Sequence, residues 1–147
     1  MVRKNITNAV IIINHIFQVS IMLGLAYLQS LTNTKALVMR HLYQRNLDFE
    51  NHLLSELGLK IQSIIIIILI ISSTVYFKKM IEKDKTYFRR VEAVIFIILS
   101  IIMFGIINLE FFKASLIYGY LIIGFYLILI IQSMNIRIVE KERNGQL

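Results

Sequence analysis

An unbroken run of eight large aliphatic side chains, Ile64 to Ile71, lies within the apolar stretch 61–77. Water is a poor solvent for such a run, and no polar residue interrupts it to give a helix a polar, solvent-exposed face. Because lipid offers no partners for backbone amides, the run must be helical in a bilayer, despite the strand preference of isoleucine. The sequence therefore predicts a membrane-spanning helix here.

Three further stretches, 6–31, 91–109 and 114–134, approach the length of roughly 20 apolar residues that a span requires. The composition agrees, since 57% of the chain is hydrophobic and 17% is charged, against roughly 45–50% and 25% in soluble domains. A soluble bundle would need a polar face on every helix, and 61–77 and 91–109 have almost none. We expect an all-α integral membrane protein in which four transmembrane helices form a single domain over 1–147.

Basic residues gather on one side of a chain that crosses four times. The N-terminus, the loop 78–90 and the segment after 134 hold eleven of the sixteen lysines and arginines. The positive-inside rule places those three regions in the cytoplasm. We expect both termini to be cytoplasmic and the protein to be a multi-pass component of a bacterial cell inner (cytoplasmic) membrane.

The connection 32–60 is far longer than a turn requires. Its apolar residues fall on half of a helical wheel, which predicts an amphipathic extracytoplasmic helix over about 35–57, with Gly58 as a C-terminal stop. Such a helix lies on the outer leaflet, folds over its own bundle, or docks a partner. A carboxylate on its apolar face disfavours lipid and indicates a protein contact. The residues of this predicted partner-docking helix are Leu42, Tyr43, Asn46, Phe49 and Glu50.

The first span is the least lipid-like, because Asn14, His15 and Gln18 form a polar intramembrane stripe. Polar side chains inside a membrane face protein or water rather than lipid. One interpretation is that they hydrogen-bond to neighbouring spans. The other is a polar path for a small solute or protons, with His15 as the titrating group. His15 is the only ionisable residue deep in any predicted span, and relays usually chain several.

The fourth span carries a stripe of residues suited to close helix packing: Ser115, Gly119, Tyr126 and Ser133. Small residues four apart let another helix approach closely. The approaching helix belongs either to the same chain or to a second copy in a homo-oligomer, and the sequence leaves both open.

Signatures of catalysis are missing. The chain has no cysteine, no glycine-rich phosphate loop, no HExxH and no nucleophile beside a base. No convergent polar cluster can be assembled from the predicted spans. We expect no enzyme activity, no cofactor and no metal site. Nucleic acid is not an expected partner either, because the basic loop 78–90 is tied to a span at each end.

Three hypotheses for function remain. The first is a non-enzymatic membrane protein that acts through protein contacts, as an accessory subunit of a membrane complex or an immunity-type protector against a membrane-active toxin. The second is a small oligomeric transporter or channel with a polar path along the first span. The third is a holin-like pore former.

Overall fold

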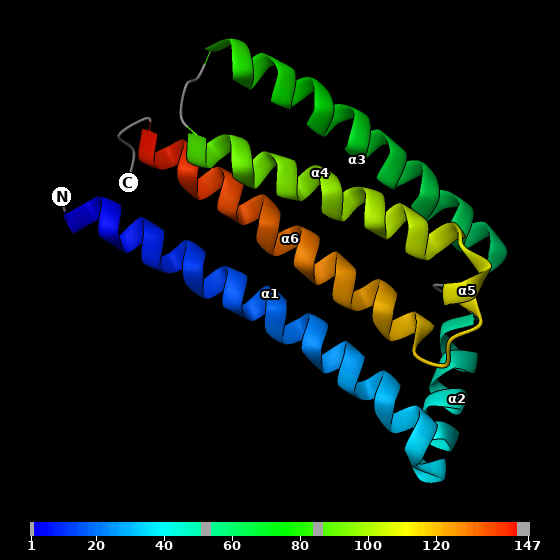
Figure 1. Ribbon diagram of the computed structural model, residues 1–147. Coiled ribbons are helices and arrows are strands. Elements are labelled where there is room, and N and C mark those ends of the chain that lie inside the picture. The colour runs from blue at the N-terminus through cyan, green and yellow to red at the C-terminus, as the bar shows by residue number, and fades with distance from the viewer. Residues whose placement is uncertain (1, 51–53, 84–86, 144–147) are drawn as a thin grey trace.

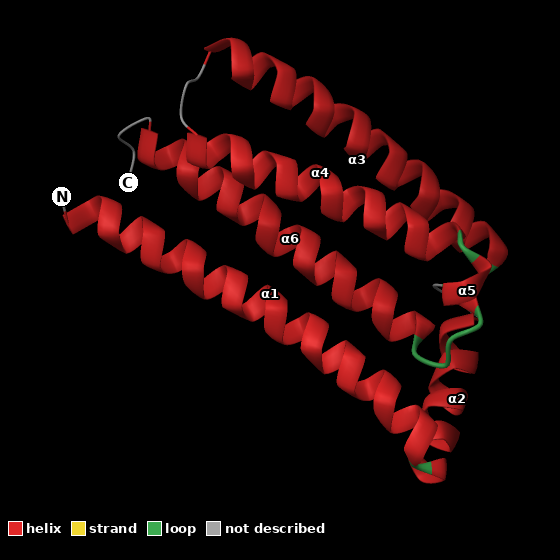
Figure 2. Ribbon diagram, in the orientation of Figure 1, coloured by secondary structure: helices red, strands yellow, loops and turns green. Residues whose placement is uncertain are grey.

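The computed structural model describes residues 2–50, 54–83 and 87–143, and every regular element in those ranges is a helix (Figures 1 and 2). In chain order they are α1 (Val2–Thr34), α2 (Ala36–Glu50), α3 (Glu56–Lys83), α4 (Tyr87–Asn108), α5 (Glu110–Lys113) and α6 (Tyr118–Arg143). The helices α1, α3, α4 and α6 are each long and apolar enough to cross a bilayer. The expectation of an all-helical chain with four such helices is confirmed.

The apolar stretches in these helices are Thr7–Thr32, Glu56–Lys79, Arg90–Asn108 and Tyr118–Glu140. The last begins four residues later than the sequence suggested, because residues 114–117 form a turn rather than a helix. Within that turn the Tyr118 amide donates to the Ser115 carbonyl, and the Ile117 amide contacts the Ser115 hydroxyl. Ser115 therefore sits just outside α6.

The four long helices lie side by side in the order α3, α4, α6, α1 (Figure 1). The first turn of α1, the end of α3, the start of α4 and the end of α6 meet at one end of the molecule, and α2 and α5 lie at the other. The basic residues that the sequence assigns to one side of a membrane therefore occur at one end of the structure wherever they are described.

The core lies where α4 meets α3 and α6. Ile66 of α3, Met103 and Ile107 of α4, and Ile122 of α6 are almost completely buried there. The outer helices α1 and α3 expose most of their apolar side chains, including Ile13 and Leu23. Large exposed aliphatic faces on both outer helices are stable only in an apolar solvent, which agrees with the membrane interpretation.

The connection between α1 and α3 holds a shorter helix than the sequence suggested. The backbone of α2 ends at Glu50, and α3 begins at Glu56, so Leu57 lies in the first turn of α3. The amide of Gly58 donates to the Ser55 hydroxyl at 3.1 Å, which is the contact that an N-cap serine makes. Ser55 therefore starts a new helix, and Gly58 lies inside it rather than ending the previous one.

Helix α2 contacts α6 through the aromatic side chain of Phe49. Phe49 packs edge-to-face on Tyr120, with the ring centroids 5.6 Å apart. It lies so close to Gly119 that a Cβ atom there would meet the Phe49 ring at 2.5 Å. Leu42 is also buried, whereas Leu37 and Leu47 remain exposed. Glycine at position 119 is what lets α2 lie against α6.

We expect Gly119→Ala to loosen α2, because the added methyl group collides with the Phe49 ring. The steric cost is about 1–3 kcal/mol. Hydrogen–deuterium exchange of residues 36–50 in detergent should rise, while exchange in α4 stays unchanged. Gly24→Ala is the control, since nothing lies within 4 Å of a Cβ at that position. Equal exchange in the two variants would contradict this account of α2.

Candidate functional site

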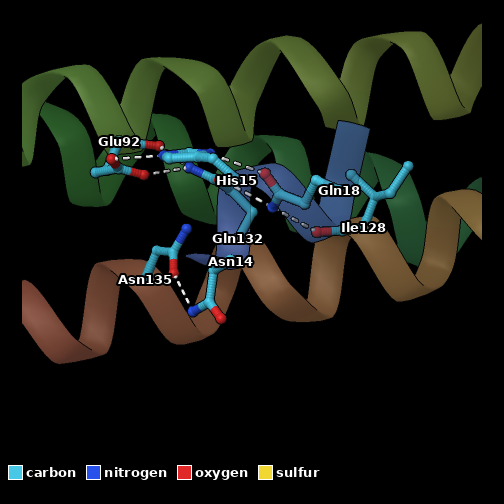
Figure 3. Close-up of polar contacts among 7 residues, drawn as sticks. All are labelled: Asn14, His15, Gln18, Glu92, Ile128, Gln132 and Asn135. Atoms are coloured by element: carbon cyan, nitrogen blue, oxygen red, sulfur yellow. Dashed lines mark hydrogen bonds and ion pairs between the residues drawn. The ribbon is translucent and has the colours of Figure 1, made fainter. Parts of the chain in front are cut away.

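The polar stripe of α1 faces two other helices of the chain. Asn14 contacts α6, His15 contacts α4, and Gln18 reaches both the backbone and a side chain of α6 (Figure 3). Gln18 is buried, and His15 keeps about a third of its side chain exposed. All three predicted residues are therefore brought together, and each meets partners far away in the sequence.

His15 is paired with a carboxyl group that sequence reasoning missed. Its Nε2 atom lies 3.0 Å from Oε1 of Glu92, a residue near the start of α4 that is only 2% exposed. His15 is therefore not the only ionisable side chain inside the bundle, although the sequence singled out no other. The sequence places Glu92 at the edge of the third apolar stretch, and only the packing of α1 and α6 against α4 buries it.

Two glutamines close these contacts into a ring. His15 Nδ1 lies 2.9 Å from Gln18 Oε1, and Gln18 Nε2 donates to Gln132 Oε1 at 3.0 Å. Gln132 Nε2 in turn donates to Glu92 Oε2 at 2.7 Å. The four side chains, His15, Gln18, Gln132 and Glu92, thus form one closed hydrogen-bonded circuit across α1, α4 and α6, which we call the polar ring (Figure 3). The convergent cluster that the sequence did not reveal is present.

Backbone carbonyls fix the orientation of both amides in the ring. Gln18 Nε2 also donates to the carbonyl of Ile128, and Gln132 Nε2 donates to the carbonyl of Glu92. A carbonyl only accepts, so each amide nitrogen must face it. Gln18 Oε1 is then an acceptor, and His15 must carry a proton on Nδ1.

The proton on Nδ1 determines the total charge of the pair. A hydrogen bond between His15 Nε2 and Glu92 Oε1 needs a second proton between those two atoms. The pair is then either an imidazolium facing a carboxylate or a neutral imidazole facing a carboxylic acid. Both arrangements have a net charge of zero, which is the condition for burying ionisable groups in a low-dielectric interior.

A second amide pair lies beside the ring. Asn14 Nδ2 donates to Asn135 Oδ1 at 2.6 Å, and Asn135 is completely buried. Among the residues that the structure describes, Asn135 Nδ2 has no hydrogen-bond partner. In Figure 3 this nitrogen points toward the polar ring. A buried donor without an acceptor is costly, so this end of the site is less well satisfied than the ring itself.

The sequence did contain a signal for the α6 side of the site. Gln132 and Asn135 are three residues apart and share a face of α6, as Asn14 and Gln18, four apart, share a face of α1. Two polar pairs with matching helical spacing in two apolar spans indicate facing surfaces. No comparable local signal identified Glu92, which has apolar neighbours on both sides.

The packing stripe of the fourth span meets residues of the same chain. Ser115 donates to Gln29 of α1 at 2.9 Å, Gly119 receives Phe49, and Tyr126 lies 3.5 Å from Gln62 of α3. Ser133 lines a groove between α3 and α6. The close contacts available at the first three positions are thus made within the chain.

The predicted docking residues of α2 divide into three groups. Leu42 and Phe49 contact the chain's own bundle, and Tyr43 is exposed. The side chains of Asn46 and Glu50 lie outside the described part of the structure. Leu42 and Phe49 are therefore already in contact with the chain's own helices.

A groove of about 590 Å³ opens between α1 and α6, near the end that carries α5. Met22, Leu25 and Ala26 line one wall, and Phe111 stands beside it with 82% of its surface exposed. Within the groove the only hydrogen-bonded polar side chains are Gln29 and Ser115, among those described. It is an apolar groove with a small neutral polar patch on its wall.

Within the described ranges, no three histidine, cysteine, aspartate or glutamate side chains are placed to hold a metal ion. The chemistry available at the polar ring is the holding and sharing of protons among one imidazole, one carboxyl group and two amides. Comparison with family models, with curated proteins and with solved structures gave no match.

The ring predicts a strong coupling between His15 and Glu92. Glu92→Leu leaves His15 without its partner in an apolar interior and should lower the free energy of unfolding by about 3–5 kcal/mol. His15→Leu combined with Glu92→Leu should cost clearly less than the sum of the two single variants, because no unpaired ionisable group remains. Denaturation in mixed detergent micelles gives the free energy of unfolding of the parent, the two single variants and the double variant.

Glu110→Leu is the matched control, since Glu110 is an exposed carboxylate at the far end of the molecule. It should change the free energy of unfolding by less than about 0.5 kcal/mol. If the effects of His15→Leu and Glu92→Leu simply add, the two residues do not act as a pair.

Proposed function

We propose that the protein is a non-enzymatic membrane protein that acts through contacts with another membrane protein. It serves either as an accessory subunit of a membrane complex or as an immunity-type protector against a membrane-active toxin. The observation that carries this proposal is the open apolar groove between α1 and α6. A groove of about 590 Å³ beside an exposed aromatic residue is well suited to receive side chains of an apolar helix.

The composition of the groove favours a helix as its occupant. Ala26 and Ala114 are small and allow close approach, while Met22 is a flexible side chain that adapts to different partners. The Gln29–Ser115 hydrogen bond leaves lone pairs and amide protons available for a polar residue of the partner. Helices that associate in lipid use small residues and polar side chains in this combination.

The closed polar ring supports contact rather than transport. Both oxygens of Glu92 and both ring nitrogens of His15 are engaged within the ring. A conducting path would need these groups to exchange partners with a solute or with water. In the ring they join α1 to α4 and α6, which is the role of intramembrane hydrogen bonds that hold spans together.

The proposed orientation places both termini in the cytoplasm of a bacterial cell and the protein in its cytoplasmic membrane. Support comes from the basic residues at the end of the molecule that holds Lys78, Lys79 and Arg137. Helix α2, with its mixed polar and apolar surface, then lies outside the cytoplasm together with α5 and the mouth of the α1–α6 groove. A membrane-active toxin arriving from outside would meet this end first.

Cysteine labelling tests the orientation directly, because the chain contains no cysteine. Lys113→Cys should react with an impermeant thiol reagent in intact cells, and Lys79→Cys should react only after the cells are opened. Both residues are exposed, so protection by the fold does not complicate the comparison. The reverse pattern would overturn the orientation.

Ala26→Trp should fill the α1–α6 groove and prevent a partner from entering. We expect the partner that co-purifies with the parent protein in mild detergent to fall about tenfold or more with Ala26→Trp. Ala9→Trp is the matched control, since Ala9 is also an exposed alanine of α1 but lines none of the grooves described here. Mass spectrometry of the purified complexes quantifies the partner.

Two results would contradict the proposal. One is that the parent protein purifies only as a monomer and that cells with Ala26→Trp behave like cells with the parent protein. The other is a solute or proton flux in liposomes that disappears with His15→Leu, which would favour a small transporter with its path along α1.

A further inference from the structure

Helix α4 lies between α3 and α6 (Figure 1), and residues of all three helices line a second groove. It consists of two adjoining hollows of about 400 and 360 Å³. Phe96, Ser133 and Arg137 line both, so the two hollows are neighbours. This groove is separate from the one between α1 and α6, with which it shares no residue.

The two hollows differ in chemistry. The one nearer the middle of the helices is lined mainly by aliphatic side chains, among them Ile65, Leu69 and Ile130. The one nearer the helix ends contains the hydroxyl groups of Ser72, Ser73 and Tyr76, together with charged residues from α6. The groove is therefore apolar at one end and polar at the other.

The polar hollow lies at one end of the candidate spans, where we expect the lipid headgroups. The spanning stretches of α3 and α6 end at Lys79 and Glu140, within a few residues of Tyr76 and Arg137. The apolar hollow extends from there into the span. Ile130 precedes Arg137 by about 10 Å along α6, at 1.5 Å per residue. The groove thus follows the direction from headgroup to hydrocarbon.

The charged residues of the polar hollow occur in a fixed order along α6. Arg137 lies nearer the hydrocarbon, and Glu140 lies one turn further out. A guanidinium group matches the geometry of a phosphate, and the Ser72 hydroxyl beside it is a further donor, whereas the Ser73 hydroxyl already donates to the Leu69 carbonyl. A carboxylate accepts hydrogen bonds from a primary ammonium group. From the middle of the helices outward, the groove therefore presents apolar side chains, then a cation and then an anion.

That order matches one class of lipid. In an ethanolamine phospholipid the acyl chain is followed by a phosphate and then by a primary ammonium group. A phosphatidylglycerol has no ammonium group for Glu140. The trimethylammonium group of a phosphatidylcholine has no N–H to donate. Charge complementarity therefore selects the ethanolamine headgroup over the other two.

We propose that the α3–α6 groove binds one ethanolamine phospholipid of the adjacent leaflet. Its phosphate pairs with Arg137, its ammonium group pairs with Glu140, and one acyl chain occupies the hollow beside Ile65 and Leu69. The lipid fills the space between α3 and α6 and thereby joins α3, which packs mainly on α4, to the rest of the bundle.

Native mass spectrometry of the full chain in detergent tests this proposal. Phosphatidylethanolamine, phosphatidylcholine and phosphatidylglycerol with identical acyl chains are added separately, and the fraction of protein with one bound lipid is measured. We expect phosphatidylethanolamine to be retained about tenfold better than the other two. Arg137→Gln should reduce that retention about tenfold, the loss expected when one charge-assisted hydrogen bond is removed.

Glu140→Gln separates headgroup recognition from general lipid binding. It should remove the preference for phosphatidylethanolamine over phosphatidylcholine while leaving the binding of phosphatidylcholine unchanged. Ile130→Trp should reduce the binding of all three lipids, because it fills the apolar hollow. Lys113→Gln, an exposed cation at the opposite end, should change nothing. Circular dichroism confirms that each variant keeps its helices.

Other outcomes overturn the proposal. Equal retention of the three lipids, with no effect of Arg137→Gln, would mean that the groove holds only bulk lipid. A preference for phosphatidylglycerol that Arg137→Gln removes would mean that an anionic headgroup binds and that Glu140 plays no part. Binding of free phosphoethanolamine as strong as that of the whole lipid would show that the apolar hollow does not contribute.

Discussion

The contact between His15 and Glu92 is the constraint on which the arrangement of the helices depends. An ionisable group in hydrocarbon must be paired or neutral, and here the pairing partner comes from a different helix. Since Gln18 and Gln132 complete the ring, a shift of α1 along α4 or α6 would break these hydrogen bonds and leave polar atoms unpaired. Apolar contacts alone would not specify that register, because lipid chains replace them at little cost.

The ring also explains why the bundle has open sides. It joins α1 to α4 and α6 near one end, and towards the other end an apolar groove lined by Ala26 and Ser115 lies between α1 and α6. On the opposite side, α3 meets the rest of the molecule mainly through α4, which leaves the second groove along α6. A protein made of four helices in a row cannot cover all of its apolar surface by itself. The neighbouring lipid or protein molecules complete it.

Sequence reasoning found half of the ring. His15 and Gln18, together with Asn14 beside the ring, stand out because a polar side chain in an apolar span costs free energy unless it faces protein or water. Glu92 and Gln132 did not stand out. Glu92 lies two residues from Arg90, where a charge is ordinary at a membrane boundary, and Gln132 lies near the basic C-terminal segment. Their importance comes from their partners, and partners 77 and 114 residues away cannot be identified from local periodicity.

The four apolar helices and the gathering of cations at one end were determined by the sequence alone. A run of aliphatic residues can satisfy its backbone in lipid only as a helix, and the spacing of the runs decides which connections share an end. Only the structure showed that α2 ends before Ser55. Only the tertiary structure brought the Phe49 ring against Gly119 and His15 against Glu92. The last two depend on the distance between residues far apart in the chain. Hydrophobicity and helical period carry no information about that distance.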